Sequence, residues 1–202
     1  MNDQYVITGI GTEVGKTVVS AIVAESLSAT YWKPVQAGDL ASSDSIKIMT
    51  YTTNVSVLQE AFRLNSPMSP HAAAEKDGVK ISLDDLQIPR VDGNLIIEGA
   101  GGLMVPINND GLLYIDAFEK WGLPVIVVSR HYLGSINHSL LTIEMLKNRG
   151  CQIEGIVFVG DENRTTEEAI LKCSGVKMLA RIPLADKVDR SFIAEQAKLF
   201  QL

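Results

Sequence analysis

The chain has 202 residues and a formal net charge of −6, with 46% hydrophobic and 21% charged residues. This composition is typical of a globular protein, and the length predicts a single domain over residues 1–202. The acidic balance argues against a nucleic-acid partner, which would need a basic face. A small anionic ligand stays compatible with it, because a binding site needs only local positive charge.

The sequence contains no apolar run of the roughly 20 residues that span a bilayer. The first residues, MNDQYVITG, lack the basic and apolar segments of a signal peptide. Cys151 and Cys173 stand in no metal-binding spacing. We therefore expect a cytoplasmic protein with no membrane partner and two ordinary thiols.

The first half of the chain alternates short β-branched runs with segments of helical spacing. This pattern predicts strands at 5–8 and 31–35 and helices at 16–27 and 44–51, the second helix capped by Ser43. Residues 54–92 are punctuated by Pro67, Pro70 and Pro89, and only a helical turn at 83–86 is predicted there.

The second half is more regular. A strand at 94–97 leads into a glycine-rich stretch, and later strands are predicted at 124–129, 153–159 and 176–182, with helices at 114–121, 135–148, 166–173 and 191–200. Strands alternating with helices of this length predict an α/β fold, a doubly wound and mostly parallel sheet with helices on both faces. Such sheets bind ligands at the carboxyl ends of their strands.

The segment GIGTEVGKT, residues 9–17, follows the first strand and opens the first helix, which is where a phosphate-binding loop stands. Its backbone N–H groups would surround phosphate oxygens, Lys16 would reach the terminal phosphates and Thr17 would ligate Mg²⁺. The strict pattern has glycine where Ile10 stands, between Gly9 and Gly11. The alternative is a glycine-rich turn with a surface lysine; we favour a fold of the phosphate-loop NTPase type.

Three further polar residues are candidates for the site. Glu98 precedes the glycines of GAGG, where an acidic residue commonly serves the metal in such proteins; the alternative is an exposed glutamate at a strand end. Lys33, between Trp32 and Pro34, would stabilise an anionic substrate, unless it is a solvated lysine. Asp44 is a further metal candidate, although it also reads as a helix-start residue.

Five motifs in this order resemble the dethiobiotin synthetase family: TGIGTEVGKT at 8–17, WKPV at 32–35, SPMSPH at 66–71, IEGAGG at 97–102 and LGSINHSLL at 133–141. The resemblance implies an ATP-dependent ligase of biotin synthesis acting on 7,8-diaminopelargonate and CO₂ or bicarbonate. One amine becomes a carbamate, the carbamate attacks the γ-phosphate of ATP, and the second amine closes the ureido ring. The reaction needs two anions held in line, which explains two lysines and a metal.

The resemblance also assigns roles to residues. Lys33 and Lys16 are implied as the catalytic lysines, with Lys33 on the carbamate, and Mg²⁺ would be bound by Thr17, Asp44 and Glu98. The implied substrate-binding residues are Thr12, Lys33, Ala37, Ser135, Ile136 and Asn137. The implied nucleotide-binding residues are Glu13, Val14, Gly15, Lys16, Thr17, Val18, Asp44, Glu98, Gly99, Ala100, Gly101, Ile182, Pro183 and Leu184.

In the family, the helix start within the LGSIN segment is supplied by the partner subunit and holds the substrate carboxylate, which implies a homodimer with composite sites. Two departures stand out. Ala37 occupies a position where the family often has Ser or Thr, so a hydroxyl contact to substrate is lost. The asparagine that commonly reads adenine is replaced by the stretch FVGD at 158–161, with Asn163 as a candidate substitute and Arg181 beside the other wall of the base pocket.

Other classes of phosphate-loop protein fit the sequence less well. A regulatory ATPase of the partitioning type typically has a lysine early in the loop, where this chain has Ile10 and Gly11, and no basic amphipathic tail is present. A related amidoligase for corrinoid precursors usually carries a glutaminase domain, for which 202 residues leave no room. A degenerate nucleotide-binding module would not need Lys16, Thr17 and Glu98 together.

Overall fold

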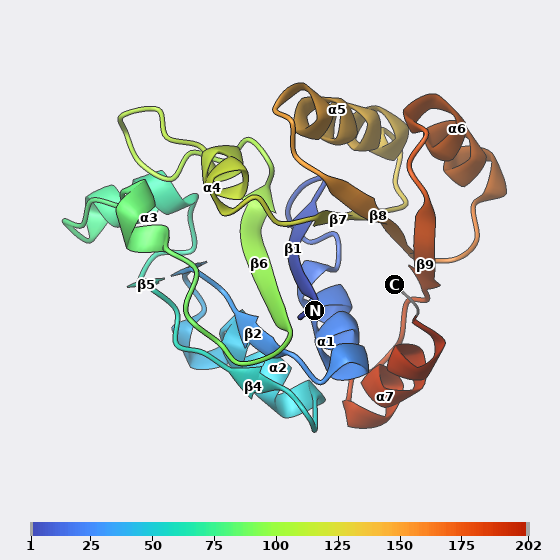
Figure 1. Ribbon diagram of the computed structural model, residues 1–202, viewed down its shortest axis with the longest axis horizontal. Helices are drawn as coiled ribbons and strands as arrows, with labels where there is room; N and C mark the ends of the chain where they lie inside the picture. The colour runs from blue at the N-terminus through green and yellow to red at the C-terminus, as the bar shows by residue number, and fades with distance from the viewer. Residues whose placement is uncertain (1, 201–202) are drawn as a thin grey trace.

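Seven parallel strands form the central sheet of the computed structural model, which describes residues 2–200 (Figure 1). The strand order is β4-β2-β6-β1-β7-β8-β9. After β1 the chain forms β2, β4 and β6 on one side of β1, and then β7, β8 and β9 on the other side. The winding direction therefore reverses next to β1. The strands are β1 (Gln4–Gly9), β2 (Thr30–Trp32), β4 (Ser56–Val57), β6 (Leu95–Gly102), β7 (Val125–Arg130), β8 (Ile153–Val159) and β9 (Met178–Ile182).

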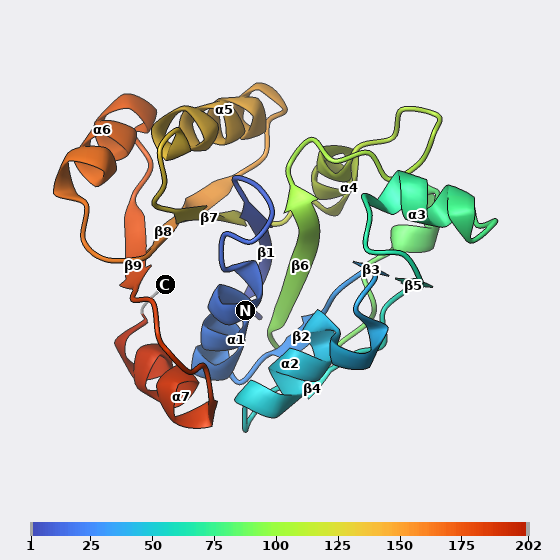
Figure 2. The same ribbon diagram turned by 180° about the vertical axis from the view of Figure 1, so that it is seen from behind.

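Helices cover both faces of this sheet, as Figures 1 and 2 show. One layer holds α1 (Lys16–Leu27), α2 (Asp44–Tyr51) and α7 (Arg190–Leu199), and the other holds α4 (Tyr114–Trp121), α5 (Ser135–Asn148) and α6 (Arg164–Ser174). Five of the six residues of β7 are buried, as expected for a parallel strand covered on both sides. The predicted doubly wound α/β fold is therefore confirmed.

The predicted strand at 31–35 is wrong, because the chain leaves the main sheet in its middle. Lys33 and Pro34 lie between β2 and β3 (Val35–Ala37), and β3 pairs with β5 (Phe62–Leu64) in a separate two-stranded sheet. Proline has no N–H to donate to a strand ladder, which is why a continuous central strand cannot pass through Pro34. The break leaves Lys33 at the carboxyl end of β2.

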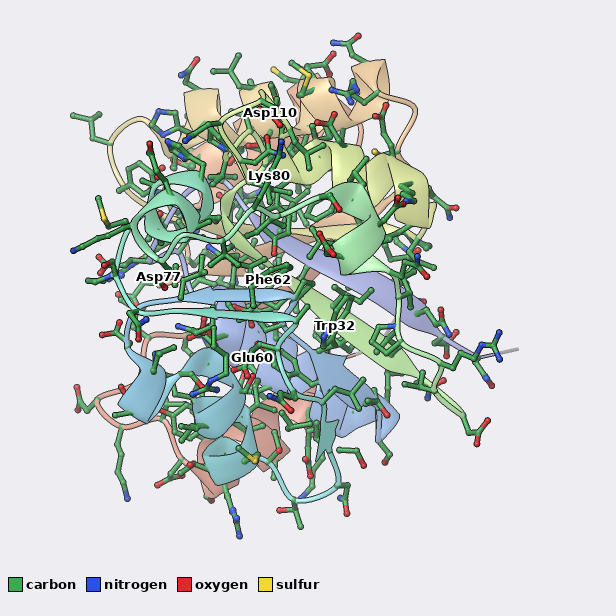
Figure 3. All side chains as sticks on the ribbon, turned by 90° about the vertical axis from the view of Figure 1, so that its left-hand side faces the viewer. Trp32, Glu60, Phe62, Asp77, Lys80 and Asp110 are labelled. Atoms are coloured by element: carbon green, nitrogen blue, oxygen red, sulfur yellow. The ribbon has the colours of Figure 1, made fainter. Side chains whose placement is uncertain are left out.

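Residues 54–92 contain more structure than was predicted. Besides the 3₁₀ turn η2 (Leu83–Leu86), which matches the expected turn, they form β4, β5 and α3 (Pro70–Lys76). Figure 3 shows the small sheet edge-on between α3 and α2, with Glu60 on the α2 side. There the Ser43 hydroxyl donates to Glu60 Oε1 at 3.3 Å. Strands of two or three residues are too short to produce a detectable period.

Elsewhere the predicted boundaries differ from the observed ones by a few residues. The strand predicted at 94–97 continues to Gly102, α6 starts at Arg164, β9 starts at Met178, and α7 runs one residue earlier than expected. A short 3₁₀ turn, η1 (Leu40–Ser42), precedes α2. Within residues 2–200, no helix combines the length and the apolar character needed to cross a membrane.

Candidate functional site

The loop between β1 and α1 depends on glycine at two positions. A Cβ on Gly9 would lie 2.6 Å from Val14 Cγ2, and Gly15 has φ of 96° in the left-handed region that favours glycine. Ile10, which stands where the strict pattern has glycine, is only 8% exposed, and its N–H donates to Val128 O at 3.1 Å. Its side chain therefore belongs to the core, and the loop accommodates it in place of the glycine.

Lys16 opens α1 and lies folded over the loop. Its Nζ donates to Gly11 O at 2.8 Å, and the residue is 8% exposed. Burial lowers the pKa of Lys16 to about 8, because a charged amine is costly away from water. An arriving anion would restore the ordinary preference for the charged form. The alternative of a surface lysine is thus excluded.

Lys33 is the centre of a buried ionic cluster. Its Nζ lies 2.6 Å from Asp44 Oδ2 and 3.0 Å from Glu98 Oε1. Lys33 is 4% exposed and Glu98 is 0% exposed, so neither is the solvated end-of-strand residue considered as an alternative. The cluster joins the end of β2, the start of α2 and the middle of β6.

Electrostatics favours the charged forms of Lys33 and Asp44 in this cluster. Burial would lower the pKa of Lys33, but the Glu98 and Asp44 carboxylates outweigh burial and raise this pKa above its ordinary value. Burial likewise opposes ionisation of Asp44, yet the Lys33 ammonium, assisted by Lys47, lowers the pKa of Asp44 to about 2. The ammonium of Lys33 is therefore a permanent positive charge at neutral pH.

Asp44 is a helix-start residue whose carboxylate also reaches the buried cluster. It is the first residue of α2, whose cap Ser43 accepts a hydrogen bond from Ile46 N at 3.3 Å. Its own N–H donates to Gln36 Oε1 at 3.2 Å, and Gln36 Nε2 donates to Gly38 O at 2.9 Å. This network fixes the helix start so that the Asp44 carboxylate reaches Lys33.

A cavity of about 770 Å³ lies over the loop and the cluster. Most of the predicted site residues line it together: Thr12, Glu13, Gly15, Lys16, Thr17, Val18, Lys33, Ala37, Asp44, Glu98, Ala100 and Gly101. The SPMSPH motif contributes its residues 67–70. Lining residues that the sequence did not single out include Gln36, Asp39, Lys47, Tyr51 and Val188. Of these, only Gln36 and Asp39 could have been suspected from the sequence, because they are polar residues that follow the WKPV motif closely.

Other predicted residues lie away from this cavity. Val14 packs on Gly9, Gly99 on Phe118, and Ile182 is 2% exposed. Pro183 and Leu184 are exposed beyond β9, and Ser135, Ile136 and Asn137 stand at the start of α5. Asn163, considered as a reader of the base, instead caps α6 by accepting from Thr166 N at 3.2 Å.

The donor atoms of the cavity suit magnesium. Among residues 2–200, no group of three or more His, Cys, Asp or Glu residues could hold a metal ion. Mg²⁺, however, takes one or two carboxylates together with phosphate oxygens and water. Thr17 Oγ1 donates to Glu98 Oε1 at 3.0 Å, so hydroxyl and carboxylate oxygens are already adjacent. With Asp44 on the other side of Lys33, these hard oxygens fit a magnesium-nucleotide complex.

Solved structures with this fold include phosphate-loop ATPases. A ParA family ATPase from Chlorobium tepidum is 13% identical, with a TM-score of 0.56 and 98% of each chain covered. The septum site-determining protein MinD complexed with Mg-ADP from Pyrococcus horikoshii is 13% identical, with a TM-score of 0.59 and 98% of this chain and 96% of that chain covered. At such identities the likeness shows the fold alone.

Sequence comparison is more specific. A family model described as an AAA domain matches residues 3–191. The ATP-dependent dethiobiotin synthetase BioD of Christiangramia forsetii is 54% identical over 100% of this chain and 97% of its own length. The protein of the same name from Rhodopseudomonas palustris strain BisB18 is 50% identical over 94% of this chain and 91% of its own. With the loop and the buried lysine cluster in place, the chain belongs to the ATP-dependent dethiobiotin synthetase family.

Proposed function

We propose that this chain is an ATP-dependent ligase that closes the ureido ring of dethiobiotin from 7,8-diaminopelargonate and CO₂, releasing ADP and phosphate. The observation that carries the proposal is the position of Lys33, buried between Asp44 and Glu98 and lining the same cavity as Lys16. One cationic group thus stands at the triphosphate position and a second stands beside it, as a reaction between two anions requires.

The phosphate loop and the start of α1 would bind the triphosphate through backbone N–H groups, with Lys16 on the terminal phosphates. Thr17, Asp44 and Glu98 would hold Mg²⁺, which neutralises charge on the β- and γ-phosphates when bound. The cavity is also lined by Val18, Tyr51 and Val188. We assign these residues to the nucleotide. The stretch 182–184 stays a proposed wall for the base.

The chain's own residues would act by holding and orienting the substrate. One amine of the diamine adds to CO₂ and loses a proton, giving a carbamate that the Lys33 ammonium stabilises. A carbamate oxygen attacks the γ-phosphorus and ADP leaves. The second amine then attacks the carbamoyl carbon of the mixed anhydride, inorganic phosphate leaves with the electron pair, and the ring closes. Thr12 and the backbone of Ala37 would position the diamine.

A homodimer is part of the proposal. Ser135, Ile136 and Asn137 do not line the cavity of their own chain, and the neighbouring Leu133 is fully exposed. Exposed apolar residues also include Tyr132, just before α5, and Leu141, within α5. An apolar surface around an available helix N-terminus supports docking of a second copy, whose α5 would then bind the substrate carboxylate. We place this reaction in the cytoplasm, where ATP and Mg²⁺ are available.

The first test measures phosphate release with diaminopelargonate, bicarbonate, Mg²⁺ and ATP present and with each omitted in turn. We expect release to require all four, with dethiobiotin appearing in equal amount by mass spectrometry. One second candidate is a regulatory ATPase, because the phosphate loop and Lys16 at the cavity would serve ATP hydrolysis as well. Vigorous ATP hydrolysis without the diamine, and no dethiobiotin, would support that candidate and contradict the synthetase.

The second test uses the lowered pKa of Lys16, about 8 in the free protein. Bound triphosphate favours the charged amine, so nucleotide affinity is full below pH 8 and falls as pH rises above it. We expect a roughly tenfold loss of affinity for a non-hydrolysable ATP analogue between pH 7 and pH 9. Isothermal titration calorimetry in buffers of different ionisation enthalpy should show proton uptake near pH 8.5.

A Lys16→Arg variant is the control for this experiment, because a guanidinium stays charged over the whole range. Its affinity should be independent of pH between 7 and 9, whatever its absolute value. A wild-type affinity that does not change over this range, without proton uptake, would contradict the assignment of Lys16 to the phosphates.

A further inference from the structure

A tyrosine lies directly beneath the proposed metal ligand Glu98. The Tyr31 hydroxyl donates to Glu98 Oε2 at 2.8 Å, and both residues are 0% exposed. Tyr31 does not line the cavity, and no motif in the sequence pointed to it. It therefore contacts a site residue without access to the ligands themselves.

Strand register explains the contact. In the parallel pair β2–β6, Tyr31 lies opposite Ile96, and Glu98 is two residues further along β6. Side chains two residues apart on a strand share a face, so Glu98 is the diagonal neighbour of Tyr31, within reach of an aromatic side chain. The contact is thus fixed by the backbone of the central sheet and not by a loop.

The two oxygens of Glu98 are divided between different partners. Oε1 accepts from Thr17 Oγ1 and from Lys33 Nζ, both at 3.0 Å. Oε2 accepts from Tyr31, the one side chain in residues 2–200 that hydrogen-bonds to it. Because a carboxylate is planar, holding Oε2 against the sheet fixes the direction in which Oε1 points, which is toward the phosphate loop.

The phenol is suited to this task because it is an uncharged side chain with one hydrogen to donate, and that hydrogen bond goes to Glu98 Oε2. A neutral donor binds Oε2 without adding a second positive charge to compete for Oε1.

We propose that Tyr31 is a positioning residue for the metal site: its hydroxyl holds Glu98 so that Oε1 faces Thr17 and the magnesium of the bound nucleotide. This inference rests on the proposed function, because the magnesium site is part of that proposal. Partners that orient metal ligands in this way typically change metal affinity about 10–100-fold when removed.

The test compares Tyr31→Phe with the wild type in Mn²⁺ binding, followed by the electron paramagnetic resonance of free Mn²⁺ with a non-hydrolysable ATP analogue present. We expect the dissociation constant for Mn²⁺ to rise about tenfold or more. In assays, the Mg²⁺ concentration for half-maximal turnover should rise by a similar factor. Affinity for the analogue without metal should stay within about twofold, because the phosphate loop is untouched.

Tyr114→Phe is the matched control. The Tyr114 side chain is also 0% exposed, and among residues 2–200 its hydroxyl bonds to no carboxylate. It tests the loss of one buried hydroxyl in the same core, and its Mn²⁺ affinity should equal that of the wild type. A Tyr31→Phe variant that is folded by circular dichroism and binds Mn²⁺ as the wild type does would overturn the proposal.

A second comparison tests whether Tyr31 acts through Glu98. Glu98→Gln and the double variant Glu98→Gln/Tyr31→Phe should bind Mn²⁺ equally, because Tyr31 has no carboxylate left to orient. A further loss in the double variant would show that Tyr31 acts elsewhere and would overturn the proposal. Failure of the proposed function is recognised separately, since wild-type protein would then form no dethiobiotin whatever the Mn²⁺ result.

Discussion

Lys33→Ala should lower dethiobiotin formation by about 10²–10³-fold while changing the affinity for an ATP analogue by less than about threefold. Lys33 is the buried cation between Asp44 and Glu98, and in the proposed reaction its ammonium faces the carbamate. Without it, two carboxylates would face an anionic intermediate. Turnover is measured as dethiobiotin formed, and nucleotide affinity by calorimetry.

Lys120→Ala provides the control for this variant. Lys120 is also an ion-paired lysine, lying 2.7 Å from Asp84, but it is on α4 and outside the cavity. It should keep wild-type turnover. A Lys33→Ala enzyme with near-normal turnover would remove the role assigned to this lysine, even if the remainder of the proposed function stood.

Glu98→Ala should produce the largest loss of stability. The substitution removes a fully buried acceptor that serves Thr17, Tyr31 and Lys33, and it leaves the buried ammonium with one carboxylate. Breaking a buried ion pair from one side typically costs about 3–5 kcal/mol. With a urea dependence of about 2 kcal/mol per molar, the unfolding midpoint should fall by roughly 1.5–2.5 M. Turnover should fall below detection.

Glu119→Ala is the comparison for Glu98→Ala. Glu119 pairs with Arg149 at the surface, so its removal should shift the urea midpoint far less. Both midpoints come from equilibrium denaturation followed by circular dichroism. If Glu98→Ala unfolded at the wild-type midpoint, the cluster would not contribute to the stability of the folded chain.

The fold was predictable wherever one element produced a long, uniform pattern. The apolar run of β7 and the helical spacing of α5 gave correct types and nearly correct ends. The single strand predicted at 31–35 is wrong because proline has no backbone N–H to donate. At Pro34 the chain therefore leaves the hydrogen-bond ladder of the central sheet. The small sheet of β3 and β5 is held by tertiary pairing between segments of three residues, which leaves no period in the sequence.

The site residues that belong to sequence motifs were predictable. The residues that hold those motif residues in place were not. The loop, Lys33 and Glu98 are predictable from their places at the ends of predicted strands. Tyr31 was missed because a tyrosine in a buried strand looks like any core residue, and only the register of β2 against β6 brings it to Glu98. The stretch at 182–184 was expected at the nucleotide, yet it lies outside the cavity.

The charge balance of the cavity also indicates which form of the nucleotide binds more tightly. Lys16 and Lys33 are matched by Asp44 and Glu98, so these four side chains together carry no net charge when all are ionised. A bare triphosphate would bring several negative charges into a site in which the Lys33 ammonium is already paired with two carboxylates. We therefore expect the site to bind ATP together with its divalent cation, and to bind free ATP more weakly.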